Sequence, residues 1–331
     1  MKVLIIQNKR IGDVLISSII ANNFKAKYPN SEVHFMAYDF THGVILNNPN
    51  IDKIISINAK ELKKLPNLFK LIRQIRKEKY DIIFDPYSKT QSKLICKFSG
   101  AKLTTGKRSR KKLGNAWKYY THPITALKQK TKICGAAIEG RIQLLNQAGN
   151  FEPIDYEPKI FLSEEEKSDF FFSDNIDKKV VVFGILGSTP QKSMPYNYVA
   201  KIVDYIASHF DVKILFNYTP DQKEEAKKIF DLCNYKSNII FDCKAPTIRD
   251  FVKLMNQCVA LISNEGGSVH IAKALNKPTF TIFSPYVIKD DWASFEDGKF
   301  HKSVHLLDFL PNAISNLSHE ERKRIEKNPT E

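Results

Sequence analysis

The stretch KVLIIQNKRIGDVL, residues 2–15, decides the fold class of this 331-residue chain. Its continuous apolar run at residues 3–6 is typical of a strand that is buried on both faces of a sheet. Gly12 and Asp13 then turn the chain into a segment, residues 14–28, whose apolar side chains recur at helical spacing. The sequence therefore begins with a strand, a turn and a helix, the unit from which parallel sheets are built.

Strands and helices continue to alternate along the chain. In the first half we expect strands at 33–38, 53–57 and 81–84, and a basic amphipathic helix at 61–77. The pattern restarts with strands at 180–183, 212–216, 238–241, 259–263 and 279–283, and with helices at 196–209, 221–233, 247–257 and 268–275. This pattern predicts an α/β protein with two doubly wound domains. Ligands of such sheets bind at the carboxyl ends of the strands, so we expect the site in the cleft between the domains.

The domain boundaries follow from the same pattern. We place the first domain at residues 1–155, a linker at 156–177, the second domain at 178–311 and a helical C-terminal tail at 312–331. The linker contains an acidic cluster, Glu164-Glu165-Glu166. No internal sequence repeat relates the two domains.

The net charge of +15 belongs to the first half alone. Residues 1–150 contain 28 Lys and Arg against 9 Asp and Glu, a net charge of +19, whereas the remainder contains 23 against 27, a net of −4. This asymmetry indicates a polyanionic partner for the first half: nucleic acid, an anionic membrane surface or a phosphorylated glycolipid. The alternative is a lysine-rich surface that only contacts solvent.

Several classes of protein are excluded. The first apolar run is too short for a secretion signal, and no stretch approaches the roughly 18 apolar residues that span a bilayer, so we expect a soluble intracellular protein. The five cysteines are widely spaced and are predicted to be free thiols. The sequence lacks the glycine-rich motifs of NAD enzymes and P-loop NTPases and the motifs of zinc proteases and serine hydrolases.

Three places could carry chemistry. Asp13 is either a helix cap, which its position alone favours, or a general base. In the run Ser263-Asn264-Glu265-Gly266-Gly267-Ser268-Val269-His270, two glycines and a helix start could bind phosphate; a tight turn is the equal alternative. The loop Gly187-Ser188-Thr189-Pro190-Gln191-Lys192 could hold a diphosphate, although surface loops often have such a composition.

The order of these and other motifs resembles a known family. Residues 2–15 resemble the opening of glycosyltransferase family nine, the ADP-heptose:lipopolysaccharide heptosyltransferases. Matches follow in the family's order at residues 24–29, 48–55, 80–85, 192–195 and 263–285.

The resemblance implies a GT-B fold: two facing Rossmann-like domains, the first for the acceptor and the second for the nucleotide-sugar donor. It implies Asp13 as the catalytic base of an inverting transfer that needs no metal and no cofactor. The residues that it implies for each substrate are, for the donor, Ser188, Thr189, Lys192, Glu265, Gly266, Gly267 and His270, and, for the acceptor, Lys60, Lys63, Lys64, Lys93 and Arg110.

The sequence departs from the family pattern mainly on the donor side. Glu265 and Gly266 replace the family's usual Asp and Thr, Met194 replaces a Trp, and Gln222 aligns with a common ribose-binding Glu. On the acceptor side, Gln91 stands where a Lys is often found. These changes leave the transferase prediction intact and bear on the identity of the donor.

The resemblance and the charge asymmetry predict the same cellular location. We expect a cytoplasmic enzyme at the inner face of a bacterial inner membrane, in peripheral contact with anionic lipid, that acts on a phosphorylated glycolipid and binds no nucleic acid. Two alternatives remain open: a GT-B transferase that uses a UDP- or GDP-sugar, and a non-catalytic protein that binds RNA or another polyanion.

Overall fold

The computed structural model describes residues 1–108, 118–125, 134–169, 171–172, 178–243, 245–285, 287–313, 315 and 321, with only the backbone of Gln191. It divides the chain into two compact units, Met1–Phe161 and Leu162–Glu331. Within the described residues, each unit holds one sheet of six parallel strands. The predicted α/β class with two doubly wound domains is therefore confirmed.

The sheet of the first unit has the strand order β3-β2-β1-β4-β5-β6. Its order reverses between β1 and β4, which are neighbours although two strands separate them in the sequence. In such sheets, ligands bind where the order reverses, outside the carboxyl ends of the strands. The strands are β1 (Lys2–Ile6), β2 (Glu32–Tyr38), β3 (Lys53–Ile57), β4 (Ile82–Asp85), β5 (Leu103–Lys107) and β6 (His122–Ile124).

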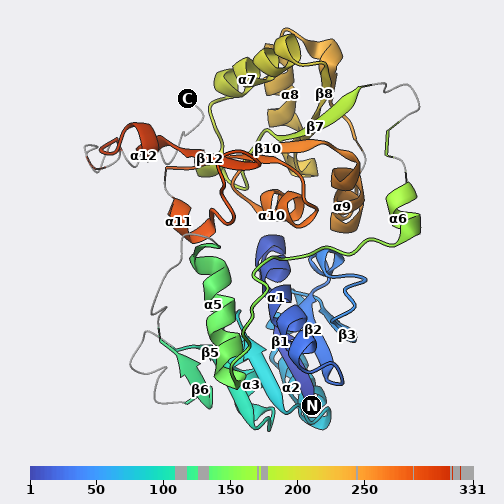
Figure 1. Cartoon of the computed structure of the whole chain (residues 1–331), viewed down its shortest axis with the longest axis vertical. Coiled ribbons are helices and arrows are strands. Elements are labelled where there is room, and N and C mark those ends of the chain that lie inside the picture. The colour runs from blue at the N-terminus through green and yellow to red at the C-terminus, as the bar shows by residue number, and fades with distance from the viewer. Residues whose placement is uncertain are drawn as a thin grey trace. The chain divides into compact units, whose positions relative to one another are not determined.

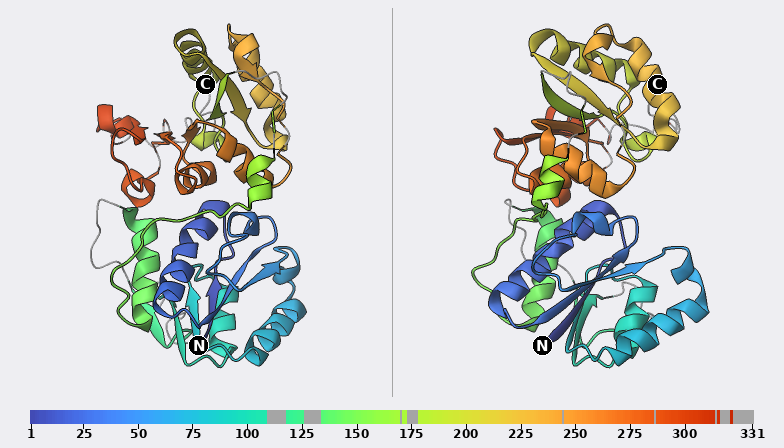
Figure 2. Two further views of the ribbon diagram at one scale, coloured as in Figure 1. Left: turned by 45° about the vertical axis from the view of Figure 1, so that its right-hand side comes forward. Right: turned by 90° about the vertical axis from the view of Figure 1, so that its right-hand side faces the viewer.

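Helices cover both faces of this sheet (Figure 1, Figure 2). On one face, α1 (Ile11–Lys27) packs beside α5 (Gly135–Leu145). On the other face, α2 (Leu65–Lys77) packs beside α3 (Thr90–Phe98) and closes a core that includes Leu4 and Ile6 of β1. The two faces of β1 are therefore both buried, which explains why its sequence is a continuous apolar run rather than an alternating one.

The helix predicted at 61–77 is interrupted. A 3-10 turn at Glu61–Lys63 is followed by extended backbone at Lys64, and α2 begins at Leu65. Pro66 explains the break, because a proline has no N–H to bond the carbonyl four residues earlier, that of Leu62, and fits only the first turn of a helix. The Leu62 carbonyl instead accepts a hydrogen bond of 2.8 Å from the Gln91 side chain.

The sheet of the second unit repeats the same topology, with the order β12-β11-β10-β7-β8-β9. Its order reverses between β7 and β10, where Gly184 stands opposite Ser263. A Cβ at Gly184 would lie 2.2 Å from the Ser263 hydroxyl, so only glycine fits there. The strands are β7 (Lys179–Gly184), β8 (Val212–Asn217), β9 (Ile239–Ile240), β10 (Ala260–Asn264), β11 (Thr279–Phe283) and β12 (His301–His305).

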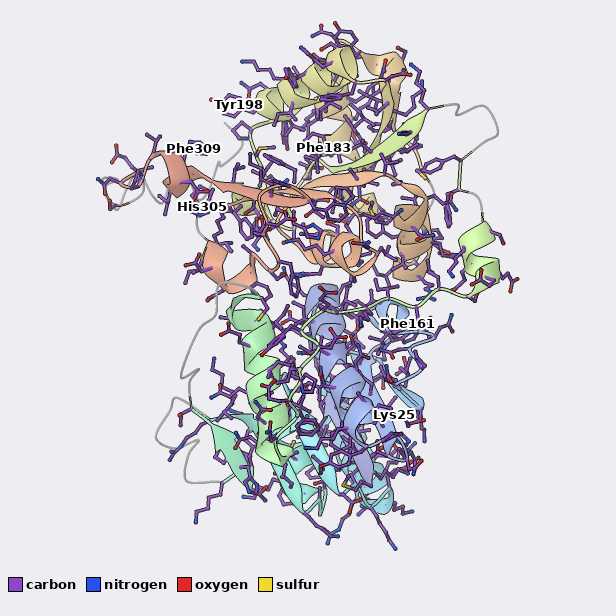
Figure 3. All side chains as sticks on the ribbon, viewed as in Figure 1. Lys25, Phe161, Phe183, Tyr198, His305 and Phe309 are labelled. Atoms are coloured by element: carbon purple, nitrogen blue, oxygen red, sulfur yellow. The ribbon has the colours of Figure 1, made fainter. Side chains whose placement is uncertain are left out.

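The helices of the second unit also divide between two faces. α7 (Tyr196–His209) and α8 (Lys223–Leu232) close a core around Phe183, which is fully buried and is labelled in Figure 3. α9 (Ile248–Gln257) and α10 (Gly267–Ala274) pack together elsewhere in the unit. Two short helices, α11 (Lys289–Trp292) and α12 (Leu306–Phe309), flank β12, and Phe309 on α12 is exposed (Figure 3).

The sequence missed several elements. It gave no indication of β5, β6, β12, α3 or α5, and the helix predicted at 221–233 begins only at Lys223, after a 3-10 turn at Pro220–Gln222. The predicted tail at 312–331 lies almost entirely outside the described residues. As predicted, all five cysteines are free: Cys96, Cys134, Cys233 and Cys258 are buried, and Cys243 is half-buried.

The segment predicted as a linker contains a short helix, α6 (Glu164–Ser168), that is attached to the second unit. Ser163 caps α6, and Glu166 makes a two-bond ion pair with Arg249 of α9, Oε1 to Nε at 2.7 Å and Oε2 to Nη2 at 2.6 Å. Arg249 is only 9% exposed. Its guanidinium lowers the pKa of the Glu166 carboxyl to about 2, mainly through these hydrogen bonds.

Arg249→Met should lower the free energy of unfolding of the second unit by about 2 kcal/mol at pH 7, because it removes a charged hydrogen-bonded pair. A carboxyl with a depressed native pKa stabilises the fold above its unfolded pKa of 4.5 and loses this effect as the pH falls toward 2. The difference between wild type and variant, measured by urea unfolding, should therefore shrink between pH 5 and pH 2. The neighbouring exposed Glu165→Gln is the control, and a difference that does not depend on pH would contradict the assignment.

Candidate active site

Asp13 lies in the first turn of α1, just beyond the carboxyl end of β1. It is the third residue of the helix and not its cap: the cap position belongs to Arg10, and no side chain caps the helix. The cap interpretation is therefore wrong, because α1 begins at Ile11, three residues earlier than its apolar spacing indicated. An acid in the first turn is still favoured by the helix dipole.

The Asp13 carboxylate is almost buried, at 6% exposure, and one of its oxygens is held by two cations. Oδ1 accepts hydrogen bonds from Lys9 Nζ at 3.1 Å and from Arg141 Nη2 at 3.0 Å. No residue that the structure describes donates a hydrogen bond to the other oxygen, Oδ2. Oδ2 therefore retains its capacity to accept a proton.

Arg141 is a residue of this candidate site that the sequence did not reveal. It comes from α5, 128 residues away from Asp13, and also bonds Ser17 Oγ at 3.2 Å and the Ala137 carbonyl at 2.7 Å. Burial lowers the pKa of its guanidinium, and the Asp13 carboxylate opposes that effect. The signal in the sequence was a lone cation within the otherwise mostly apolar run of Gly135–Leu145.

Two amides lie at the same strand end. Gln7 Nε2 donates to Ser17 Oγ at 3.0 Å, which links it to the Arg141 network. Asn8 is 1% exposed, and neither its Oδ1 nor its Nδ2 has a hydrogen-bond partner in the described part of the chain. A buried amide without partners is costly, so its presence beside Asp13 marks this strand end as a place where stability is not optimised.

Asp85, the last residue of β4, is a second acid at this edge of the sheet that is enclosed by the protein. Its carboxylate accepts hydrogen bonds from Tyr120 Oη at 2.6 Å and from the Ser88 backbone N–H at 2.8 Å, and it is 0% exposed. Burial raises its pKa to about 6. Because no substrate can reach a fully enclosed carboxyl, Asp85 supports the structure and Asp13 remains the candidate base.

Four of the five residues predicted to bind the acceptor follow β3 or β4, so they lie beyond the same carboxyl edge as Asp13. Lys60 and Lys63 are exposed around the 3-10 turn, and Lys64 pairs with Glu61 at 2.6 Å. Lys93 on α3 is half-buried, with its ammonium 5.8 Å from the ring centre of Tyr119. Arg110, the remaining predicted acceptor residue, lies outside the described residues.

The hydrogen bond from Gln91 to the Leu62 carbonyl joins the start of α3 to this 3-10 turn. It therefore brings the element that carries Lys93 against the one that carries Lys63. Gln91 departs from the family's usual lysine, and the structure gives it this supporting role.

In the second unit, the predicted donor residues lie where the strand order reverses. Lys192, at the end of the loop after β7, places its Nζ 2.8 Å from Oε1 of Glu265, the residue after β10. The other carboxylate oxygen of Glu265 accepts the Ser284 backbone N–H at 3.2 Å. The two predicted donor segments are thus joined by an ion pair, in which the Glu265 side chain is 7% exposed and that of Lys192 is 31% exposed.

The start of α10 lies at this same place. Gly266 is the N-cap residue of α10, and no side chain in the described part of the chain caps the helix. The first N–H groups of a helix have no partners within it, and the helix dipole favours an anion there. A Cβ at Gly266 would meet no atom within 4 Å, so the space above this turn is open. Gly267 begins α10, and His270 is its fourth residue, with its ring 6.1 Å from that of Trp292.

The loop after β7 is tightly folded. Thr189 is the N-cap residue of a 3-10 turn, Pro190–Lys192, and Ser188 precedes it. A Cβ at Gly187 would lie 2.3 Å from the Lys192 carbonyl oxygen, so the loop closes on itself only because this residue is glycine. Gln222 donates to the Gly187 carbonyl at 2.8 Å, so the residue that replaces a ribose-binding Glu holds the loop.

Metal chemistry was predicted to play no part. Among the residues that the structure describes, no group of three or more His, Cys, Asp or Glu side chains could hold a metal ion. The transfer without metal or other cofactor stays a prediction. In the same described part of the chain, no helix is long and apolar enough to cross a membrane.

Comparison with known proteins identifies the family. The model of a family described as glycosyltransferase family 9 (heptosyltransferase) matches residues 68–289, about two thirds of the chain. The chain belongs to glycosyltransferase family 9. It is therefore a glycosyltransferase, and the family suggested by the sequence motifs is confirmed.

Relatives match over most of the chain. Lipopolysaccharide heptosyltransferase 1 of Campylobacter coli is 21% identical over 289 residues, which cover 86% of this chain and 84% of that protein. Among solved structures, ADP-heptose lipopolysaccharide heptosyltransferase II of E. coli has a TM-score of 0.74 at 20% identity and covers 92% of this chain and 90% of that one.

A second solved structure carries a donor analogue. E. coli heptosyltransferase WaaC with ADP-2-deoxy-2-fluoro heptose has a TM-score of 0.70 at 16% identity and covers 99% of this chain and 100% of that one. At such identities the likeness is one of fold, and it confirms the predicted GT-B class of this family 9 glycosyltransferase.

Proposed function

We propose that this glycosyltransferase moves heptose from ADP-L-glycero-D-manno-heptose to the inner core of lipopolysaccharide or lipooligosaccharide, at Kdo–lipid A or the growing heptose region. The observation that carries the proposal is the Lys192–Glu265 ion pair beside the uncapped start of α10. A cation, free N–H groups and open space at a strand-order reversal suit the diphosphate of a nucleotide-sugar. We take the heptose donor and the lipopolysaccharide acceptor from the names of the relatives.

On the acceptor side, Asp13 acts as the general base. Oδ2 takes the proton of the acceptor hydroxyl as its oxygen attacks the anomeric carbon of the donor, and the configuration at that carbon inverts. Lys9 and Arg141 hold the carboxylate through Oδ1, so the base keeps one orientation while it accepts the proton. Lys60, Lys63, Lys64, Lys93 and Arg110 would bind the phosphates and carboxylates of the glycolipid.

On the donor side, the bond between the anomeric carbon and the diphosphate oxygen breaks, and ADP leaves with the electron pair. Lys192, the N–H groups at the start of α10 and His270 stabilise the charge that develops on the diphosphate. Glu265 orients Lys192 through their ion pair. We propose that these groups replace a divalent ion. Ser188 and Thr189 would supply hydroxyl donors to the same diphosphate.

The first half's charge of +19 supports a location at the inner face of the inner membrane, in the cytoplasm. Anionic lipid attracts such a surface and would concentrate the enzyme where a glycolipid acceptor resides.

A thermal-shift titration with ADP, UDP and GDP, each in EDTA, tests the donor. We expect ADP to raise the unfolding temperature and the other two to have little effect, because a ligand that binds only the folded protein stabilises it. Transfer from ADP-heptose to Kdo–lipid A is the confirming assay. A shift with UDP or GDP instead would mean that the donor is a UDP- or GDP-sugar, while the reaction would still be glycosyl transfer. Binding only with added Mg²⁺ would contradict the metal-free mechanism, and no shift with any of the three would contradict the proposed nucleotide site.

A further inference from the structure

The solvent-facing side of α2 combines large apolar and basic side chains. Leu65 and Phe69 are one helical turn apart and are 65% and 60% exposed. Residues three or four apart share one side of a helix, so these two form one apolar contact at its first turns. Four exposed basic residues follow Phe69 on the same helix. We call this the α2 docking face: Leu65, Phe69, Lys70, Arg73, Arg76 and Lys77.

The cations of this face have no acidic partner among the residues that the structure describes. α2 contains no acidic residue, and no side chain in the described ranges pairs with Lys70, Arg73, Arg76 or Lys77. The acids at either end of the helix are already bound: Glu61 pairs with Lys64, and Glu78 pairs with Lys2 and Lys53. The face therefore presents four uncompensated positive charges over a helix of about 20 Å.

An open groove lies on the same surface. Among the described residues its lining comes from α2 alone: Pro66, Phe69, Lys70, Arg73, Gln74 and Lys77. Three cations at the groove suit an anionic headgroup, and Phe69 provides an apolar side chain beside them.

The other side of α2 is fixed in the core, which settles which side is offered to a partner. Leu68, Ile72 and Ile75 are buried against the sheet and α3. In an ordinary surface helix, the apolar stripe is buried and the residues that face water are polar. Here two large apolar residues stand in the exposed arc beside four cations, the composition of a helix that lies in a membrane interface.

We propose that the α2 docking face binds an anionic phospholipid bilayer, with Leu65 and Phe69 in the interfacial region and the four cations against headgroup phosphates. This inference rests on the proposed function for its setting, because a lipid-anchored acceptor requires an enzyme at the bilayer. It goes further in assigning the contact to one helix. The attraction adds roughly a fivefold gain in partitioning for each cation near the surface, and the apolar pair supplies the short-range contact.

Sedimentation with phosphatidylcholine vesicles, with and without phosphatidylglycerol, tests the face in the absence of nucleotide. The wild type should bind only the anionic vesicles. Phe69→Ser should weaken binding about tenfold. The double change Arg73→Glu and Lys77→Glu should weaken it at least about 25-fold. The matched controls lie in the second unit: Phe210→Ser, where Phe210 is 56% exposed, and Lys201→Glu with Lys228→Glu. They should bind as the wild type does.

The outcomes separate this inference from the proposed function. The unfolding temperature of each variant, and its rise with ADP, should equal those of the wild type, because no changed residue belongs to the donor site. The inference is overturned if the α2 variants bind anionic vesicles as tightly as the wild type, or if the wild type does not bind them. In either case the ADP shift can still support the proposed transferase function. Binding of RNA, without vesicles, through the same residues would also overturn it.

Discussion

Asp13→Asn should lower turnover by about 100-fold or more while the affinity for ADP stays near that of the wild type. The amide has nearly the shape of the carboxylate and can still accept from Lys9 and Arg141, but it cannot take the acceptor's proton. Removal of a general base costs typically 10²–10⁴-fold in rate. Single-turnover transfer from ADP-heptose, with ADP binding measured by titration, separates the chemical step from donor binding.

The control for this change is Asp81→Asn. Asp81 precedes β4, at the amino edge of the same sheet, and bonds the Lys2 backbone N–H at 2.9 Å. The Asp81→Asn variant removes one acid from this unit and leaves the carboxyl edge of the sheet unchanged. Its turnover should stay near that of the wild type. A folded Asp13→Asn protein with near-normal turnover would remove Asp13 from the role of base.

Lys192→Met should lower turnover by about 10²–10³-fold and also weaken ADP binding. Two effects add. The leaving diphosphate loses a preorganised cation, which by itself has such a magnitude in other enzymes. In addition, the nearly buried Glu265 carboxylate loses its partner at 2.8 Å, and an uncompensated anion repels the diphosphate.

The double variant Lys192→Met with Glu265→Gln separates these effects. Removing the anion should restore part of the ADP affinity without restoring turnover, because the cation at the leaving group is still missing. Lys201→Met, at an exposed position of α7 in the same unit, is the control for loss of a lysine. Turnover of the double variant within about threefold of the wild type would show that Lys192 only neutralises Glu265.

The sequence predicted those helices and strands whose apolar residues recur at a regular spacing or form a continuous run. The strands of residues 3–6 and 180–183 were found because continuous apolar runs mark strands buried on both faces. β5 reads Leu-Thr-Thr-Gly-Lys and β12 reads His-Lys-Ser-Val-His, so neither has such a run. Both pair with neighbouring strands through the backbone, which the side-chain pattern does not report.

The site divides in a similar way. The two predicted donor segments could be named from the sequence because each is short and contiguous, and the ion pair between Lys192 and Glu265 shows that they lie together. Arg141 was not predictable, since its role depends on the packing of α5 against α1. The capping role that position alone favoured for Asp13 was wrong because α1 begins at Ile11, three residues earlier than the apolar spacing indicated, and Asp13 is already inside the helix.

The buried thiols give each half of this chain its own reporter. Cys96 and Cys134 lie in the first unit, and Cys233 and Cys258 in the second, where burial raises the pKa of both thiols to about 12. An alkylating reagent attacks the thiolate, so it modifies these residues only after their surroundings open. Timed alkylation followed by peptide mass spectrometry would therefore give two opening rates from one unlabelled sample, and would reveal whether ADP slows the opening of one half or of both.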